Sequence, residues 1–217
     1  MFDKICEFNL KITSSKVCFI LDGALAKMDK NVETTQFSDA SDLLTKQLVN
    51  KSKLDNSAVY IGRSPIGYPI VIPMCSKKLF NLEASYSRRY PYILNVLFPN
   101  DCLIGVDIEL ETNMYNNSLN SLFTIKEIEL AQLISPLALW SAKEALSKFI
   151  KTGLLASIDV FEIESIIYKN GYYEVLFKKF PSIICYVMEY HEIFIAICLQ
   201  NKFVIENLNE LVKMNLD

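Results

Sequence analysis

Apolar and polar residues alternate along much of this 217-residue chain, and the alternation predicts a protein built mainly from short β-strands. Strands are expected at residues 17–21, 59–72 (strand, turn, strand), 92–98, 103–110, 160–167, 172–177, 183–188 and 193–199. Asp22-Gly23 is expected to end the first strand in a turn, and Asn170-Gly171 is the strongest hairpin signal. A hairpin that joins 92–98 to 103–110 would leave residues 85–89 as a loop near one of its ends.

Three helices are predicted between these strands. The first runs from Ser38, a suitable N-cap, to about Leu48. The second begins at Thr124-Ile125-Lys126-Glu127, which has the form of a capping box. The third runs from Ser135-Pro136 to Gly153, which can end it in the left-handed conformation. Residues 112–121 are rich in asparagine and serine and are expected to form a loop.

The order of the elements predicts an α+β fold in two halves. Each half begins with a strand, continues with helix and ends with antiparallel strands, although the first half follows this order more loosely. The similarity hints at an internal duplication.

An acidic pair stands out in the run Gly105-Val106-Asp107-Ile108-Glu109. Side chains of a strand point alternately to its two faces, so Asp107 and Glu109 share one face with Cα atoms about 6.6 Å apart. Two interpretations are open at this point. The carboxylates can share a cation, or they can form the solvated outer face of an edge strand, which the pentapeptide alone favours.

The helix at 135–153 carries a polar stripe beside its apolar face. Its members are Trp140, Lys143, Glu144, Ser147, Lys148 and Lys151. One face is therefore core, and the other is functional or solvated. Glu144 and Lys148 form an i,i+4 pair worth about 0.3–0.5 kcal/mol on a surface, as in any solvated helix, but Trp140 fits that interpretation poorly.

Composition excludes several classes of protein. The formal net charge of −3 gives no basic field for nucleic acid. The apolar stretch 183–199 is interrupted by Glu189, His191 and Glu192, which favours two strands over a membrane helix. No basic residues followed by a long apolar run occur near residue 1, so a cytoplasmic protein is expected. His191 is the single histidine and is expected at the surface, and the six scattered cysteines are expected as thiols.

Three motifs follow one another: Gly105-Val106-Asp107-Ile108-Glu109, then Phe123-Thr124-x-x-Glu127, then Trp140-x-x-Lys143-Glu144-Ala145-x-x-Lys148. Their residue types and order resemble the phosphopantetheinyl transferase superfamily, and the length resembles its larger, pseudo-dimeric type, that of the surfactin synthetase-activating enzymes. The resemblance covers roughly residues 59–200.

The resemblance implies two similar halves related by a pseudo-twofold axis, each a small antiparallel sheet packed with helices, with coenzyme A in the cleft between them. Residues 1–102 would then form the N-terminal half and part of the nucleotide site. Residues 103–217 would form the C-terminal half with the metal-binding strand and the Trp-x-x-Lys-Glu-Ala helix.

By the same resemblance, Asp107, Glu109 and Glu144 are ligands of Mg²⁺, a cation that prefers such hard oxygen donors. Lys143 and Lys148 contact the phosphates of coenzyme A, and lysine assists the leaving group. Glu144, or Glu127 acting through water, takes the proton of the attacking serine.

The implied reaction transfers the phosphopantetheine arm of coenzyme A to a serine of an acyl or peptidyl carrier protein and releases adenosine bisphosphate. The enzyme would be a monomer, and its carrier would dock near Met114 and Tyr115. Fatty-acid, polyketide and nonribosomal-peptide synthesis stay open as the pathway, as does Mn²⁺ in place of Mg²⁺.

Two departures from the family pattern affect the nucleotide half. The family usually has Gly-Lys-Pro at Gly67-Tyr68-Pro69 and Ser-His-Ser at Ser85-Tyr86-Ser87. A phenol donates a hydrogen bond but brings no positive charge, so Tyr68 and Tyr86 should hold a phosphate more weakly. Arg63, Arg88 or Arg89 can compensate by forked contact with phosphate, and Lys27 or Lys30 can help from the first half of the chain.

Two alternatives to the transferase are left open. The chain can be an impaired family member that binds a carrier protein without competent nucleotide binding. It can also be another magnesium-dependent enzyme that acts on a diphosphate.

Overall fold

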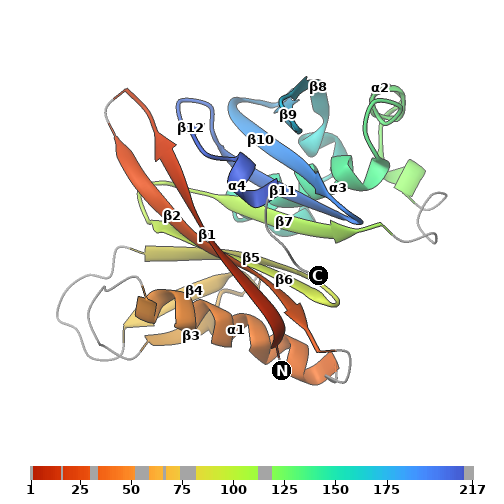
Figure 1. Ribbon diagram of the computed structural model, residues 1–217. Helices are drawn as coiled ribbons and strands as arrows, with labels where there is room; N and C mark the ends of the chain where they lie inside the picture. Colours follow the sequence, from red (N-terminus) through yellow and green to blue (C-terminus); the bar gives the residue numbers. More distant parts are fainter. Residues whose placement is uncertain are drawn as a thin grey trace. The chain divides into compact units, whose positions relative to one another are not determined.

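The computed structural model describes residues 2–15, 17–29, 34–51, 59–65, 67–73, 82–111 and 119–212. The chain divides into two compact units (Figure 1). Unit 1 comprises Met1–Leu103 together with Val204–Asp217, and unit 2 comprises Ile104–Phe203. The segment that begins at Val204 belongs to unit 1, where its short strand pairs with the first strand of the chain.

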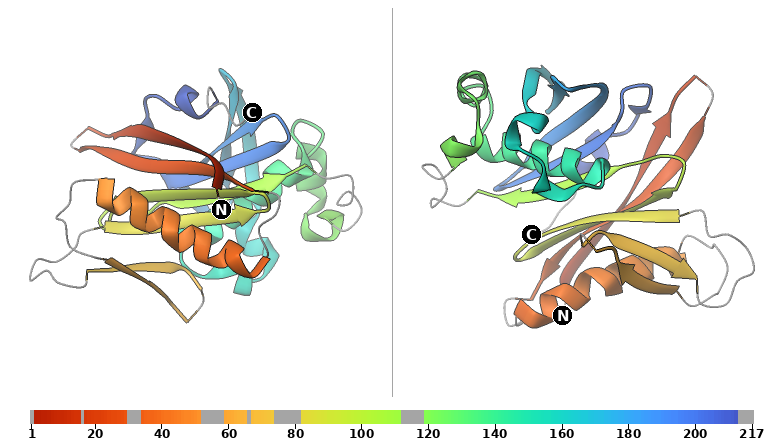
Figure 2. Two further views of the ribbon diagram at one scale, coloured as in Figure 1. Left: turned by 60° about the horizontal axis from the view of Figure 1, so that its bottom comes forward. Right: turned by 180° about the vertical axis from the view of Figure 1, so that it is seen from behind.

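Unit 1 is built on a five-stranded antiparallel sheet with the order β12-β1-β2-β6-β5. The strands are β1 (Phe2–Thr13), β2 (Cys18–Met28), β5 (Leu82–Arg89), β6 (Tyr92–Pro99) and β12 (Val204–Ile205). Helix α1 (Thr34–Lys51) and the hairpin of β3 (Val59–Arg63) and β4 (Pro69–Pro73) cover one face of this sheet (Figure 2). Apolar residues recur at helical spacing in α1, so Ala40, Leu44 and Leu48 reach the core together. A short helix, α4 (Asn209–Val212), follows β12.

Unit 2 is built on a second antiparallel sheet with the order β7-β11-β10-β9-β8. The strands are β7 (Gly105–Leu110), β8 (Ile163–Lys169), β9 (Tyr172–Phe177), β10 (Phe180–Tyr190) and β11 (Ile193–Gln200). Helix α3 (Pro136–Phe149) packs across β7, β11 and β10, and α2 (Ile125–Leu130) lies beside β8. Three 3₁₀ segments complete the unit: η1 (Leu119–Leu122), η2 (Gly153–Leu155) and η3 (Ile158–Phe161).

Several expectations from the sequence are confirmed. The fold is α+β with antiparallel sheets, and Asn170 and Gly171 turn β8 into β9 with φ angles of 45° and 95°. The apolar stretch before and after His191 forms β10 and β11, and His191 is exposed in the turn between them. Within the described part of the chain, no helix has the length and apolar character needed to cross a membrane. The pseudo-twofold relation between the halves stays a prediction.

Asp22-Gly23 does not form a turn but lies within β2. Gly23 pairs with Phe8 of β1, and a Cβ atom on Gly23 would lie only 2.2 Å from the Phe8 ring. Glycine at this position leaves room for the Phe8 ring against the strand. An Asp-Gly pair looks the same in the local sequence whether it forms a turn or permits such a close contact.

The predicted hairpin between 92–98 and 103–110 is wrong. Strand β6 pairs with β2 on one side and β5 on the other, so it has no open edge, and β7 pairs with β11 in the other sheet. Residues 85–89 are accordingly strand residues of β5 and not a loop.

The third helix ends earlier than expected. Its last residue is Phe149, and Lys151 adopts the left-handed conformation with φ of 56°, two residues before Gly153. The amide of Thr152 donates to the carbonyl of Ser147, which closes the helix end.

Strand β7 and helix α3 meet at Gly105. A Cβ atom on Gly105 would lie 2.0 Å from the carbonyl oxygen of Ala145 and 2.4 Å from the amide nitrogen of Phe149. Both of these atoms belong to helix backbone, so only glycine permits the contact.

We predict that Gly105→Ala destabilises the protein by about 1–3 kcal/mol or more, because the helix has to move away from the strand. The control is Gly62→Ala, whose Cβ would lie 3.1 Å from the flexible Ile72 Cδ1 and no closer than 3.5 Å to any other atom. That variant should stay within about 0.5 kcal/mol of the wild type. Urea denaturation measures both values, and equal effects would contradict the Gly105 contact.

Candidate functional site

The acidic face of β7 is turned toward α3. Gly105, Asp107 and Glu109 share one face of the strand, and Gly105 touches the α3 backbone. Although β7 is an edge strand, Asp107 is 1% exposed and Glu109 is 5% exposed. The interpretation as a solvated acidic edge is therefore wrong. The strand ends at Leu110, before the next acidic residue, Glu111.

Helix α3 brings a cation and a third carboxylate to this face. The ammonium Nζ of Lys148 lies 2.6 Å from Oδ1 of Asp107 and 4.0 Å from Oε2 of Glu144. Glu144 and Lys148 are one helical turn apart, so they project from the same side of α3. About a quarter of each of these two side chains is exposed, which leaves the arrangement open to solvent on the helix side.

The buried oxygens of the acidic pair are not all used by hydrogen bonds. Oδ2 of Asp107 and Oε2 of Glu109 accept none within the described part of the chain, although both residues make further interactions. Buried carboxylates require compensation by hydrogen bonds or positive charge.

Asp107, Glu109 and Glu144 fit Mg²⁺ by their donor chemistry, since all three offer hard carboxylate oxygens. Across the residues that the structure describes, however, no three acidic, histidine or cysteine side chains are gathered as a ready metal-binding group. The positive charge beside Asp107 is instead the ammonium of Lys148. A metal ion at this oxygen therefore requires the lysine to move.

A second charged pair lies deeper in unit 2. Glu127 of α2 and Lys143 of α3 are both 0% exposed, and Nζ of Lys143 lies 2.8 Å from Oε1 of Glu127. The same ammonium donates to the carbonyl oxygen of Leu122 at 3.2 Å. Oε1 of Glu127 also accepts from the amide of Ile163, and Oε2 accepts from the amide of Thr124 as part of the capping box.

These contacts place Glu127 and Lys143 in the interior of unit 2, and the roles that the resemblance implied for them stay predictions. Neither side chain reaches solvent, and both are held by partners inside the protein. Burial lowers the pKa of Lys143, while the hydrogen bond and charge of Glu127 oppose that shift. The pair ties α2, α3 and the start of β8 together. Only Glu144 and Lys148 of the predicted catalytic residues are partly exposed.

The nucleotide-binding residues predicted in unit 1 do not share one face. Tyr86 and Arg88 point to the α1 side of β5, where the guanidinium carbon atoms of Arg63 and Arg88 lie 4.8 and 5.5 Å from the centre of the Tyr86 ring. Arg63 also bonds Oδ1 of Asp42 at 2.7 Å, and burial raises the pKa of Asp42 against the opposing charge of Arg63. Tyr68 lies in the turn between β3 and β4, where its amide donates to Oγ of Ser64.

Ser85 lies on the opposite face of β5, together with Arg89. Arg89 pairs with Tyr92, and Tyr92 pairs with Lys27 of β2, which pairs with Lys4 of β1. Because directly opposed residues of antiparallel strands share a face, these side chains form a row with three positive charges, here called the basic row. All four side chains are partly exposed.

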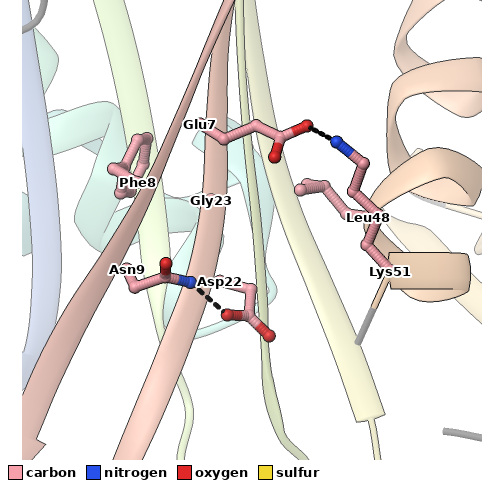
Figure 3. A pocket seen from close by; sticks show the side chains of 7 residues that line it. All are labelled: Glu7, Phe8, Asn9, Asp22, Gly23, Leu48 and Lys51. Carbon is pink, nitrogen blue, oxygen red and sulfur yellow. Dashed lines mark hydrogen bonds and ion pairs between the residues drawn. The ribbon is translucent and has the colours of Figure 1, made fainter. Parts of the chain in front are cut away.

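Unit 1 also contains a cavity of about 220 Å³ between β1, β2 and α1 (Figure 3). Its polar groups pair with one another, Glu7 with Lys51 and Asn9 with Asp22. No residue predicted for the site lines it. Three other predicted residues, Lys30, Met114 and Tyr115, lie outside the described residues.

Residues 103–198 match the family model described as the 4'-phosphopantetheinyl transferase superfamily. The matched region contains the acidic strand, both charged pairs and all of α3. The superfamily resemblance is confirmed for this part of the chain, and it indicates a transferase of phosphopantetheine. The larger, pseudo-dimeric type stays a prediction. No curated protein matches the chain.

Sequence analysis missed the part that Gly105 plays in the site. The glycine brings the α3 backbone against β7, two residues before Asp107 and at the helix turn that carries Lys148. A glycine at the start of a strand that carries functional side chains was the available signal, since such glycines often mark close backbone contacts.

We predict that Lys143→Met and Glu127→Gln each destabilise the protein by about 3–5 kcal/mol, because each leaves a buried partner without its counter-charge. The double variant, which combines Lys143→Met with Glu127→Gln, should lose less free energy of unfolding than the sum of the two single losses. Thermal and chemical denaturation measure these values.

The matched control is Lys126→Met. Lys126 is the neighbouring lysine, and it pairs with Glu164 on the surface at 3.0 Å. Lys126→Met should lower the free energy of unfolding by less than about 1 kcal/mol. Similar losses for Lys126 and Lys143 would show that burial of the Glu127 pair has no energetic importance.

Proposed function

We propose that the protein transfers the phosphopantetheine arm of coenzyme A to a serine of an acyl or peptidyl carrier protein, with Mg²⁺ as its metal. The observation that carries the proposal is the convergence of Asp107, Glu144 and Lys148 within the superfamily-matched region. Two acidic groups and a lysine meet there at a partly open surface of unit 2, which suits a reaction at a diphosphate.

Glu144 is the best candidate for the general base. Its carboxylate is partly exposed, whereas both oxygens of Glu127 already accept hydrogen bonds inside the protein. In the proposed step the serine hydroxyl gives its proton to Glu144, and its oxygen forms a bond to the pantetheine-side phosphorus. The bond from that phosphorus to the bridging oxygen breaks, and adenosine bisphosphate leaves.

Lys148 is placed to neutralise the departing phosphate, since its ammonium lies at the exposed edge of the acidic pair. Asp107, Glu109 and Glu144 would hold the metal. When bound, Mg²⁺ withdraws charge from the diphosphate and so favours attack at phosphorus.

We propose that the basic row and Ser85 bind the nucleotide phosphates of coenzyme A. Arg63 is already bound to Asp42 and stacked on Tyr86, so its cluster is better suited to join the β3–β4 hairpin to the sheet. The basic row supplies three positive charges on one surface, which compensates for the lysine and histidine that Tyr68 and Tyr86 replace.

The carrier protein is proposed to dock beside α2, which follows the segment of Met114 and Tyr115. Ile125 of α2 is 81% exposed, and Ile128 and Leu133 are also exposed. Apolar side chains at the surface favour contact with a partner.

A carrier-binding module without transferase activity is the second candidate. It is favoured by the involvement of Tyr86 in a stack with two arginines, where the family has an imidazole. Calorimetry with an apo carrier domain and with coenzyme A separates the candidates, because the module binds only the carrier.

We predict that the protein with Mg²⁺ and coenzyme A adds one phosphopantetheine mass to an apo carrier domain. Asp107→Ala and the isosteric Asp107→Asn should slow this transfer by roughly 100-fold or more, because the metal loses a ligand. Asp159→Asn, which changes an exposed acid of the same unit, should keep full activity. Mass spectrometry provides the measurement, and absence of a mass shift across fatty-acid, polyketide and peptide carriers would reject the transferase.

We also predict that Lys27→Met and Arg89→Met each weaken coenzyme A binding by about tenfold, the value of one charge-assisted hydrogen bond. Arg63→Met should instead lower the melting temperature and leave the affinity within about twofold. Isothermal titration calorimetry measures the affinities. The reverse pattern would assign the phosphates to the α1 side of β5.

A further inference from the structure

Lys148 occupies the position of a counter-ion at the acidic face of β7. Its ammonium lies 2.6 Å from Oδ1 of Asp107, a carboxylate that is 1% exposed and shares its strand face with Glu109. Two carboxylates on one face repel each other, and burial increases the cost of their charge. Lys148 therefore supplies positive charge directly beside the buried acidic pair.

The ammonium and a divalent cation cannot occupy this place together. Mg²⁺ binds carboxylate oxygens at about 2.0–2.1 Å, and an ammonium in contact with the same oxygen would lie against the metal and be repelled by its charge. Binding of a metal at Asp107 thus requires displacement of the lysine.

Lys148 can make this movement, whereas Lys143 cannot. A quarter of the Lys148 side chain is exposed, and a lysine stem of four carbons is flexible enough to swing its ammonium toward solvent. Lys143 is fully buried between Glu127 and the carbonyl of Leu122. Lys148 therefore has room to change its side-chain position, whereas Lys143, on the same helix, is fixed by its buried partners.

We propose that Lys148 is a built-in counter-ion that holds the acidic pair before the metal binds and is released by the metal toward the phosphates of the substrate. This inference rests on the proposed function, because it assumes a metal at Asp107. The exchange makes the lysine a competitor of the metal, and it makes metal binding and diphosphate binding mutually favourable.

The test measures Mn²⁺ binding by electron paramagnetic resonance with the full chain and without coenzyme A. Lys148→Met should bind Mn²⁺ about tenfold more tightly than the wild type, within the usual range of coupling between sites. Lys148→Arg keeps the charge and should show no gain. Lys126→Met removes the same charge from a surface pair and should stay within about twofold, since exposed charges are screened.

A second measurement follows thermal unfolding. In EDTA, Lys148→Met should melt below the wild type because Asp107 has lost its counter-ion, and saturating Mn²⁺ should remove the difference. Coenzyme A should raise the Mn²⁺ affinity more in the wild type than in Lys148→Met, because only the wild type releases an ammonium to the phosphates. If Lys148→Met does not fold, Lys148→Gln replaces it in all three measurements.

The outcomes separate the two proposals. Equal Mn²⁺ affinity in the wild type and Lys148→Met would overturn the counter-ion exchange and leave the proposed metal-dependent transfer standing. Absence of Mn²⁺ binding in every variant at millimolar concentration would overturn the metal site and the exchange together.

Discussion

The contact between two backbones at Gly105 is the constraint on which the candidate site depends. Since no Cβ separates β7 from α3 there, the helix lies close enough for Lys148 to reach Asp107 at 2.6 Å. The same closeness excludes water from the acidic face and turns ordinary carboxylates into buried ones. A longer separation would give Asp107 and Glu109 the solvated surroundings of a normal edge strand, in which they would attract neither a lysine nor a metal strongly.

The buried pair of Glu127 and Lys143 complements this contact by fixing how α3 is rotated. Lys143 points away from β7 toward α2, which directs its neighbour Glu144 and, one turn later, Lys148 to the acidic side. Replacing such a pair by apolar residues often preserves stability, so its value here lies in orientation as much as in energy. One helix thus carries a fully buried lysine and a partly exposed lysine five residues apart.

Local sequence patterns predicted those features that depend on local physics. Strand parity put Asp107 and Glu109 on one face, the capping box at Thr124 formed, and Asn170-Gly171 turned a hairpin. The features that sequence reasoning missed depend on distant partners. Three such features are the packing of α3 on β7, the Phe8 ring against Gly23 and the pairing of β6 with a strand on each side. Each arises from contacts between segments that lie too far apart in the sequence for any local window to contain both. For the same reason Ser85 and Tyr86, adjacent in sequence, face different surroundings on β5.

A lysine counter-ion also bears on how unit 2 can fold before it holds any metal. Proteins whose metal ligands are left as uncompensated charges commonly need the metal to fold, because binding energy and folding energy are then the same quantity. In unit 2 the ammonium of Lys148 compensates Asp107 from within the chain, and the Glu127 pair is internally neutral. Asp107 therefore has a positive charge beside it before any external cation binds, while the partial exposure of Lys148 leaves room for the proposed exchange. An apolar residue at position 148 would remove the competitor of the metal, but it would also remove the positive charge beside the buried Asp107 carboxylate. A lysine at this position therefore stabilises the acidic pair and, in the proposed exchange, still gives way to a metal.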